Sequence, residues 1–243
     1  FRGTDDSIIG WKEDFHMTYM KEIPAQKHAL TYLEDFFKQY PKQKVIIAGH
    51  SKGGNLAVFA ASQIQSDLQE KISAIYTYDA PGLQAHLTET TGYQDIIPKI
   101  QRFVPQGSVI GMMLEVPDTP IVVKSTALGG IAQHNTFSWL TEGHHFVQLE
   151  EISSESLQIK DTLKEWVDSV PDEELELYFD LFFGTILESG INSINDLSSI
   201  SAIEHIHQLV SQAKTLDPEQ VEILKNLTQL LLDARFQAWK NHF

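Results

Sequence analysis

The stretch that decides the fold is residues 44–61, KVIIAGHSKGGNLAVFAA, which contains a Gly-x-Ser-x-Gly pattern. Residues 45–48 are rich in β-branched side chains and predict a buried strand, and the small residues after Gly53 predict a helix. A serine on a sharp turn between such a strand and such a helix is typical of a nucleophile elbow. The turn requires glycine at both flanks, because a side chain at Gly49 or Gly53 would collide with the strand or the helix. We therefore predict that Ser51 is a nucleophile.

Helices and strands alternate around this turn. Apolar residues on one helical face predict a helix from Pro24 to about residue 39, and residues 71–78, 100–104 and 120–124 predict further strands. Short connections between alternating helices and strands favour a mainly parallel sheet flanked by helices, so the expected fold class is α/β. Residues 1–6 are expected to be the end of a strand and a loop, residues 11–17 and 83–98 loops or short helices, and residues near His145 a further strand. The apolar stretch 107–114 is expected to belong to the core or to line a substrate site, and the core is favoured.

The pattern changes after residue 150. Amphipathic helices are predicted at about 154–169, 172–189, 199–213 and 217–240, and no strong strand signal interrupts them. Residues 1–150 carry 16 acidic and 12 basic residues, whereas residues 151–243 carry 17 acidic and 6 basic residues. We expect a hydrolase-like core over 1–150 and an acidic helical region over 151–243. This charge disfavours nucleic acid and anionic membranes as partners, because both are bound by clustered Lys and Arg.

Composition excludes several classes of protein. The 243 residues contain no cysteine, which excludes disulfides, thiolate metal ligands and a cysteine nucleophile. His205 and His207 are spaced two apart and would point to different sides of a helix, so we expect no metal site and no cofactor. No apolar run is long enough to span a membrane, and no secretory leader is visible, so we expect a cytoplasmic protein. The chain opens at Phe1 inside what reads as a motif, so we expect it to lack its natural start.

A serine nucleophile needs a base and an acid that orients the base. On an α/β-hydrolase fold the chain order is serine, acid, histidine, each at the carboxyl end of a strand. Asp79 directly follows the predicted strand 71–78 and is the best acid by position. Asp95 and Asp118 are the other candidates downstream of Ser51. The sequence therefore predicts Asp79 as the orienting acid and leaves these two as alternatives.

The base must follow the last strands. His134 comes after strand 120–124 and a glycine-containing loop, which fits this order, and His144 and His145 are its rivals. We interpret His50, the residue before Ser51, as a packing residue whose side chain projects away from the turn. His134 is therefore the predicted general base.

The backbone N–H groups of Thr4 and Lys52 are candidates for an oxyanion hole. Lys52 opens the helix after Ser51, and Thr4 lies in a loop near the start of the chain, from which the second donor usually comes. The Thr4 hydroxyl is a candidate third donor.

Two motifs resemble one family. Phe1-Arg2-Gly3-Thr4 followed by the GHSKGGNLA run of the elbow resembles the class 3 lipases, and the likeness, which covers roughly residues 1–150, is strongest to a branch found in Gram-positive bacteria. The resemblance implies a lipase-like α/β-hydrolase core with Ser51 as nucleophile, Thr4 and Lys52 as oxyanion donors and a late histidine matching His134. It also implies strands before Phe1.

The chain departs from the family pattern at two positions. Lys52 replaces a leucine after the nucleophile, which puts a cation beside the acyl site and argues against long-chain triglyceride as substrate. Ser108 stands where the family carries its acid, and a hydroxyl cannot replace a carboxylate. The acid role therefore passes to Asp79, whose setting before Pro81 and Gly82 resembles that of lipases outside this family.

Two functional hypotheses follow. The first is a serine hydrolase of small-molecule or lipid carboxylic esters, of the esterase or lipase type, acting through an acyl-enzyme on Ser51. The alternative is a catalytically impaired module that binds a protein partner, or a second copy of itself, through its helical tail. A thioesterase or peptidase would share the same acyl chemistry.

Overall fold

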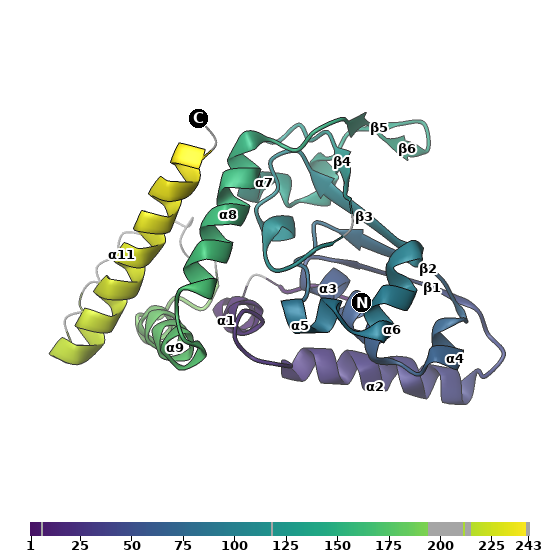
Figure 1. Ribbon diagram of the computed structural model, residues 1–243, viewed down its shortest axis with the longest axis horizontal. Helices are drawn as coiled ribbons and strands as arrows, with labels where there is room; N and C mark the ends of the chain where they lie inside the picture. The colour runs from purple at the N-terminus through teal and green to yellow at the C-terminus, as the bar shows by residue number, and fades with distance from the viewer. Residues whose placement is uncertain (6, 118, 194–210, 212–214, 242–243) are drawn as a thin grey trace. The chain divides into compact units, whose positions relative to one another are not determined.

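The computed structural model describes residues 1–5, 7–117, 119–193, 211 and 215–241, which form two compact units (Figure 1). The first unit comprises residues 1–3 and 22–160, and the second comprises the described residues among 4–21 and 161–241. This division differs from the expected boundary at residue 150. Residues 4–21 belong to the helical unit because their apolar side chains pack there, and residues 151–160 belong to the unit that holds the sheet.

A five-stranded sheet forms the centre of the first unit, in the order β1-β2-β3-β4-β7. The first four strands are parallel, and the last pairs with β4 in the antiparallel sense. The mainly parallel sheet confirms the expected α/β class, and the four parallel strands fall where the sequence predicted them. Their bounds are β1 Val45–His50, β2 Ile72–Tyr78, β3 Ile100–Pro105, β4 Ile121–Val123 and β7 Gln148–Leu149. A separate antiparallel hairpin joins β5 (Thr141–Glu142) and β6 (His145–Phe146).

Helices connect these strands. The predicted helix after Pro24 is α2, whose first position suits a proline because the N–H that proline lacks would have no partner in the helix. The segment expected as loop plus short helix contains two short α-helices and a 3-10 turn. The helices of the first unit are α2 Pro24–Gln39, α3 Lys52–Gln63, α4 Ser66–Gln69, α5 Ala85–Thr88, α6 Thr91–Ile96 and α7 Gly130–Gln133, with 3-10 turns η1 Ile97–Lys99, η2 Ile110–Met112 and η3 Thr136–Ser138. Helix α8 (Ser154–Asp168) spans the division between the units at residue 160.

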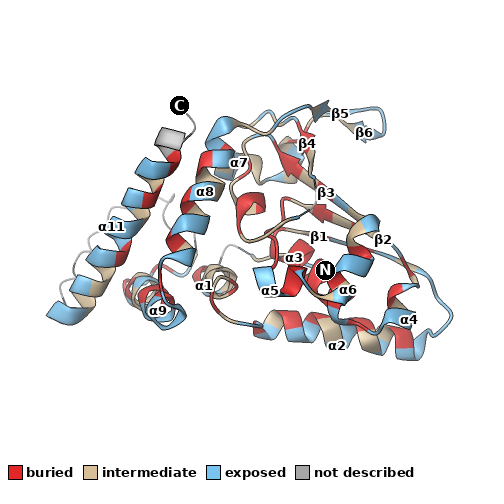
Figure 2. Ribbon diagram, viewed as in Figure 1, coloured by how far each residue is buried: buried red, intermediate tan, exposed pale blue. Residues whose placement is uncertain are grey.

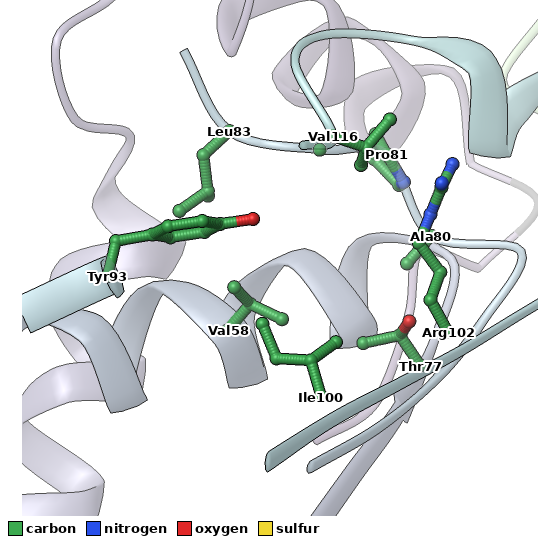
Figure 3. Close-up of a pocket in the computed structure, with 10 residues that line it drawn as sticks. Val58, Thr77, Ala80, Pro81, Leu83, Tyr93, Ile100, Arg102 and Val116 are labelled. Carbon is green, nitrogen blue, oxygen red and sulfur yellow. The ribbon is translucent and has the colours of Figure 1, made fainter. Parts of the chain in front are cut away.

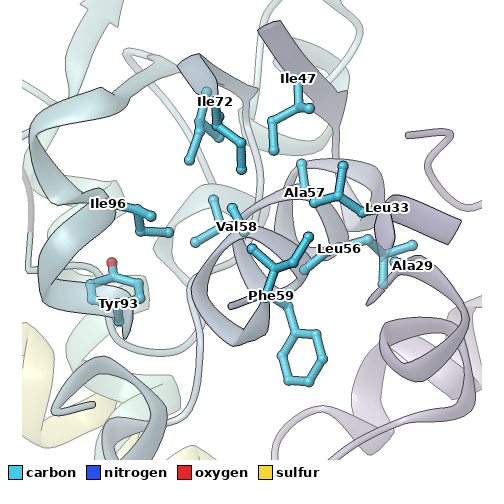
Figure 4. Packing of buried hydrophobic residues seen from close by; sticks show 14 of the residues in the cluster. Ala29, Leu33, Ile47, Leu56, Ala57, Val58, Phe59, Ile72, Tyr93 and Ile96 are labelled. Carbon is cyan, nitrogen blue, oxygen red and sulfur yellow. The ribbon is translucent and has the colours of Figure 1, made fainter. Parts of the chain in front are cut away.

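Helix α3 is the centre of the hydrophobic core. Every residue from Lys52 to Ser62 is buried, because the helix packs on β1 and β2 and is covered by α2 and α6 (Figures 2 and 4). Ala57, Ala60 and Ala61 are fully buried, and their small side chains let these neighbours approach the helix closely. The residue that follows Ser51 therefore begins the most buried helix of this unit.

An aromatic cluster consisting of Tyr76, Tyr78, Phe103, Trp139 and Phe146 packs beside the strands. Alternate side chains of a strand point to opposite faces of a sheet. Ile75 belongs to the core around α3, so Tyr76 and Tyr78, one and three positions further along the strand, extend from the other face of β2. The cluster joins β2 and β3 to β6 and to the segment that carries Trp139.

The second unit is helical. It contains α1 (Ile8–His16), α9 (Asp172–Glu188) and α11 (Pro218–Asn241), together with the last turns of α8. Trp166 lies in its core and donates its indole N–H to the backbone oxygen of Leu227 over 2.9 Å. The helices at 154–168, 172–188 and 218–241 match those predicted, whereas the helix predicted over 199–213 lies outside the described residues apart from residue 211.

The segment expected as a loop or a short helix at residues 11–17 belongs to α1. The Ser7 side chain caps this helix by accepting the N–H of Gly10. Phe15 packs against Phe179 and Phe183 of α9, which explains why a helix without a clear apolar period is stable here. Within the described part of the chain, no helix has the length and apolar character needed to cross a bilayer.

A test of the elbow uses Gly49→Ala. A Cβ on Gly49 would lie 2.1 Å from the backbone carbon and oxygen of Gly53, and backbone atoms cannot move aside as a flexible side chain can. We expect this substitution to lower the unfolding free energy by about 1–3 kcal/mol, measured by urea denaturation.

Gly184→Ala is the matched control. Nothing lies within 4 Å of a Cβ on this helical glycine, so alanine should raise stability by about 0.5–1 kcal/mol. Equal stability of Gly49→Ala and the wild type would contradict the packing argument.

Candidate active site

Ser51 occupies the turn between β1 and α3. Its φ of 56° and ψ of −136° lie in a region that non-glycine residues rarely adopt, and such strain is concentrated at functional sites. The backbone N–H of Ser51 donates to the Tyr78 oxygen over 3.0 Å, which ties the turn to the end of the neighbouring strand. The side chain of Ser51 is buried in this turn.

Asp79 directly follows the last residue of β2 and lies beside the turn that carries Ser51. It is fully buried and, like Ser51, has a positive φ, of 44°. Its Oδ2 accepts a hydrogen bond from His134 Nδ1 over 2.7 Å. The structure therefore brings together the predicted acid and the predicted base, because the carboxyl ends of parallel strands meet at one edge of the sheet.

The other oxygen of the Asp79 carboxylate is held by two donors. Ser108 donates its hydroxyl to Oδ1, and Gly111 donates its backbone N–H to the same oxygen over 3.1 Å. A Cβ on Gly111 would lie 2.6 Å from Oδ1, so this close approach needs a glycine. Such donors offset the cost of burying a carboxylate. Ser108, which stands where the resembled family carries its acid, instead binds the acid supplied by the preceding strand.

Gly111 is itself fixed by a residue of β3. Arg102 is buried and donates from Nη2 to the backbone oxygen of Gly111. Both backbone polar groups of Gly111 are therefore hydrogen-bonded, one to Asp79 and one to Arg102. Sequence reasoning missed Ser108, Gly111 and Arg102 as partners of the acid, because they come from a loop and a strand far from Asp79 in the chain.

His134 follows α7, and hydrogen bonds of its neighbour Gln133 hold this segment in place. Trp139 of the aromatic cluster donates its indole N–H to the Gln133 backbone oxygen, and the Gly107 N–H donates to Gln133 Oε1, each over 2.8 Å. The His134 side chain is 16% exposed, so solvent and small molecules can reach it. Because Nδ1 carries the proton shared with Asp79, Nε2 is the nitrogen left to accept one.

His50 contacts His134, so its interpretation as a packing residue that points away from the site is wrong. His50 Nε2 donates to the backbone oxygen of His134 over 2.8 Å, and the two ring centroids are 4.4 Å apart. Burial, followed by the neighbouring His134 charge, lowers the pKa of His50, although the bond to the His134 carbonyl and the charge of Asp79 act in the opposite direction. The sequence held no signal for this contact beyond the position of His50 next to Ser51.

A hydrolytic site also needs a contact between the serine hydroxyl and the histidine. Among the described residues, no hydrogen bond joins the Ser51 hydroxyl to His134. Catalytic hydrogen bonds are often long before substrate binds and shorten in the complex. The role of Ser51 as a nucleophile therefore stays a prediction.

The two predicted oxyanion donors lie in different units. Lys52 is the first residue of α3, where backbone N–H groups point toward the positive end of the helix dipole. Thr4 belongs to the second unit, where its hydroxyl donates to the two carboxylate oxygens of Asp14 over 2.9 and 2.7 Å. A hydroxyl has one hydrogen to donate, so the Thr4 hydroxyl, which the sequence offered as a third oxyanion donor, is already occupied by Asp14. The oxyanion roles of Thr4 and Lys52 stay predictions.

The alternative acids and bases lie elsewhere or outside the described residues. Asp95 is exposed on α6, and His144 and His145 are exposed around the β5–β6 turn. Asp118 is outside the described residues. The described residues contain no group of three or more histidine, aspartate or glutamate side chains able to hold a metal ion.

A small cavity adjoins the residues that follow Asp79 (Figure 3). Its volume of about 20 Å³ holds a single water molecule but no acyl chain. The buried hydroxyl of Thr77 has no hydrogen-bond partner within the described structure and lines this cavity together with Ala80, Pro81 and Tyr93. The cavity is therefore suited to solvent rather than to substrate.

The sheet, the serine turn and the acid–histidine pair together define an α/β protein built around a Gly-x-Ser-x-Gly elbow. In a comparison with known families, the model of the Mbeg1-like family matches residues 1–184. The chain belongs to this family. Neither a curated protein nor a solved structure matches the chain.

A test of the Asp79 environment uses Ser108→Ala. The substitution removes one of two donors to a fully buried carboxylate oxygen, and a lost hydrogen bond to a charged group costs about 1.5–3 kcal/mol. We expect the unfolding free energy to fall by this amount in urea denaturation at pH 7.

Ser189→Ala provides the comparison for this substitution. Ser189 is equally buried, but its hydroxyl donates to the neutral backbone oxygen of Ile186, so its loss should cost about 0.5–1.5 kcal/mol. If the two variants lose the same stability, the Ser108 bond has no special strength from the Asp79 charge.

Proposed function

We propose that this protein is a serine hydrolase that cleaves carboxylic esters, of the esterase or lipase type, through an acyl-enzyme on Ser51. The observation that carries the proposal is the 2.7 Å hydrogen bond between Asp79 and His134, at the edge of the sheet where the strained Ser51 turn also lies. Family membership adds support, because the Mbeg1-like family is named for a lipase-like protein. The resemblance of the elbow and of Phe1-Arg2-Gly3-Thr4 to class 3 lipases points the same way.

In the proposed reaction the Ser51 hydroxyl attacks the ester carbonyl while His134 Nε2 takes its proton. Asp79 holds the imidazole in the required tautomer and stabilises the imidazolium that forms. The negative charge on the former carbonyl oxygen is stabilised by backbone N–H groups at the start of α3, with Lys52 first among them. His134 then returns the proton to the leaving alcohol.

The second half of the reaction repeats these roles with water. His134 removes a proton from the water molecule, the resulting hydroxide attacks the acyl carbonyl, and the acid is released as Ser51 regains its proton. Every proton transfer in this scheme uses His134 Nε2. The bond of Nδ1 to Asp79 is therefore the feature on which the scheme depends.

Covalent labelling tests the proposal. A fluorophosphonate probe should add to the wild type, seen by intact mass, and Ser51→Ala should abolish that addition without lowering the thermal unfolding midpoint. Ser66→Ala, at the first position of α4, is the matched control and should label like the wild type. An unlabelled wild type would contradict the proposal and favour the alternative, a module that binds partners through its helical unit.

Substitution of the acid tests the role of Asp79. Asp79→Asn presents an amide to His134 Nδ1 and favours the wrong tautomer, so kcat for p-nitrophenyl butyrate should fall by about 10⁴-fold. Asp95→Asn changes an exposed carboxylate on α6 and should leave kcat within about twofold. Activity of Asp79→Asn within tenfold of wild type would remove Asp79 from the mechanism.

A further inference from the structure

His134 is held by two different side chains, and each of them binds a different part of the residue. Asp79 binds the imidazole of His134, whereas His50 binds the backbone oxygen of the same residue over 2.8 Å. A carbonyl oxygen only accepts hydrogen bonds, so the proton must lie on His50 Nε2. This bond therefore also defines the tautomer of a neutral His50.

The His50 ring also contacts the His134 ring. Their centroids are 4.4 Å apart and their planes are inclined by 35°, a distance at which aromatic rings are in contact. One side chain thus limits both the backbone position and the ring orientation of His134. His50 is itself held firmly, because it ends β1 and pairs in register with Tyr78 at the end of β2.

Two side-chain hydrogen bonds from outside this segment hold the neighbouring residue, Gln133. Trp139 binds its backbone oxygen and Gly107 binds its side chain. These bonds position α7, and the His134 N–H donates to the Ile131 oxygen over 3.1 Å within the same segment, so none of them ties the backbone of His134 to a strand of the sheet. Among the described residues, the bond from His50 is the hydrogen bond that ties the His134 carbonyl directly to the strand carrying Ser51.

We propose that His50 is a positioning residue for His134, a role that rests on the proposed hydrolase function. Its Nε2–H fixes the distance of the base from the turn at Ser51, and its ring limits rotation of the imidazole. A displacement of about 1 Å of a catalytic group costs up to about 100-fold in rate, which sets the size of effect that this role can have.

The charge state of His50 fits this role. His134 becomes an imidazolium during acyl transfer, and a second cation at ring-contact distance would oppose that charge. Burial and the charge of His134 lower the pKa of His50, whereas the hydrogen bond to the His134 carbonyl and the charge of Asp79 raise it. Burial is the largest of these effects and favours the neutral ring.

Two substitutions separate the hydrogen bond from the ring. In His50→Phe the ring is kept and the donor is lost, whereas in His50→Gln an amide nitrogen stands the same number of bonds from the backbone as Nε2 and can donate to the same carbonyl. With p-nitrophenyl butyrate, we expect kcat of His50→Phe to fall about 10- to 100-fold with KM unchanged. We expect His50→Gln to recover at least about half of that loss on a logarithmic scale.

The control is His86→Phe, an exposed histidine on α5, which should leave kcat and KM unchanged. A kcat of His50→Phe within twofold of wild type would overturn the inference, and so would a His50→Gln variant no faster than His50→Phe. The proposed function is judged separately by fluorophosphonate labelling of the wild type. A labelled wild type with an unaffected His50→Phe variant therefore rejects only the positioning role.

A spectroscopic readout does not depend on activity. In two-bond ¹H–¹⁵N spectra of histidine-labelled wild type at pH 7, with His50 assigned by its loss in His50→Phe, His50 should show a proton on Nε2 and none on Nδ1. A proton on Nδ1 alone, or on both nitrogens, would overturn the inference, because the described bond needs a neutral ring that donates from Nε2.

Discussion

The close contact between the end of β1 and the start of α3 is the constraint on which the first unit depends. Two glycine backbones meet there at a distance that admits no side chain, since a Cβ on Gly49 would overlap the backbone of Gly53. The chain can then reverse within one residue, and that residue, Ser51, is forced into a strained conformation. The buried helix that follows stabilises this turn, because its small residues pack against the sheet on one side and against α2 on the other.

A buried charge governs the arrangement around the turn. Asp79 is fully buried, and a buried carboxylate is tolerated only when its oxygens are hydrogen-bonded. One oxygen binds His134, and the other binds Ser108 and Gly111, the latter anchored by Arg102 of β3. Asp79, at the end of β2, thus joins β3 and the segment after it to the segment that follows α7, and the need to satisfy its lone pairs explains why His134 lies at this edge of the sheet.

The helical unit has a core of its own. Phe179 and Phe183 of α9 pack against Phe15 near the end of α1, and Trp166 hydrogen-bonds to the backbone of α11. The family match extends to residue 184, so it includes α8 and most of α9 as well as the sheet. Helices of this unit are therefore part of the family match and are not an unrelated addition to the unit that holds the sheet.

Local patterns were enough to predict the elements of the fold. β-Branched runs located the four parallel strands, the glycines around Ser51 located the elbow, and the order of residues along the chain singled out Asp79 and His134, which the structure brings together. The choice of Asp79 and His134 follows from their order along the chain, whereas the strands and the elbow follow from steric or periodic rules that act within about twenty residues of sequence. The amphipathic helices after residue 150 were predictable for the same reason.

Only the tertiary structure decided which side chains surround that pair. The bonds from Ser108 and Gly111 to Asp79, and from His50 to the backbone of His134, join segments separated by 29 to 84 residues. The assignment of residues 4–21 to the helical unit depends in the same way on aromatic side chains of α9 more than 150 residues away. The sequence by itself determined the parallel strands, the elbow and the long helices, because these depend on local sterics and periodicity, and it determined the order of Ser51, Asp79 and His134, because order is a property of the linear chain. The contacts around the site depend on how distant segments pack, and no local pattern carries that information.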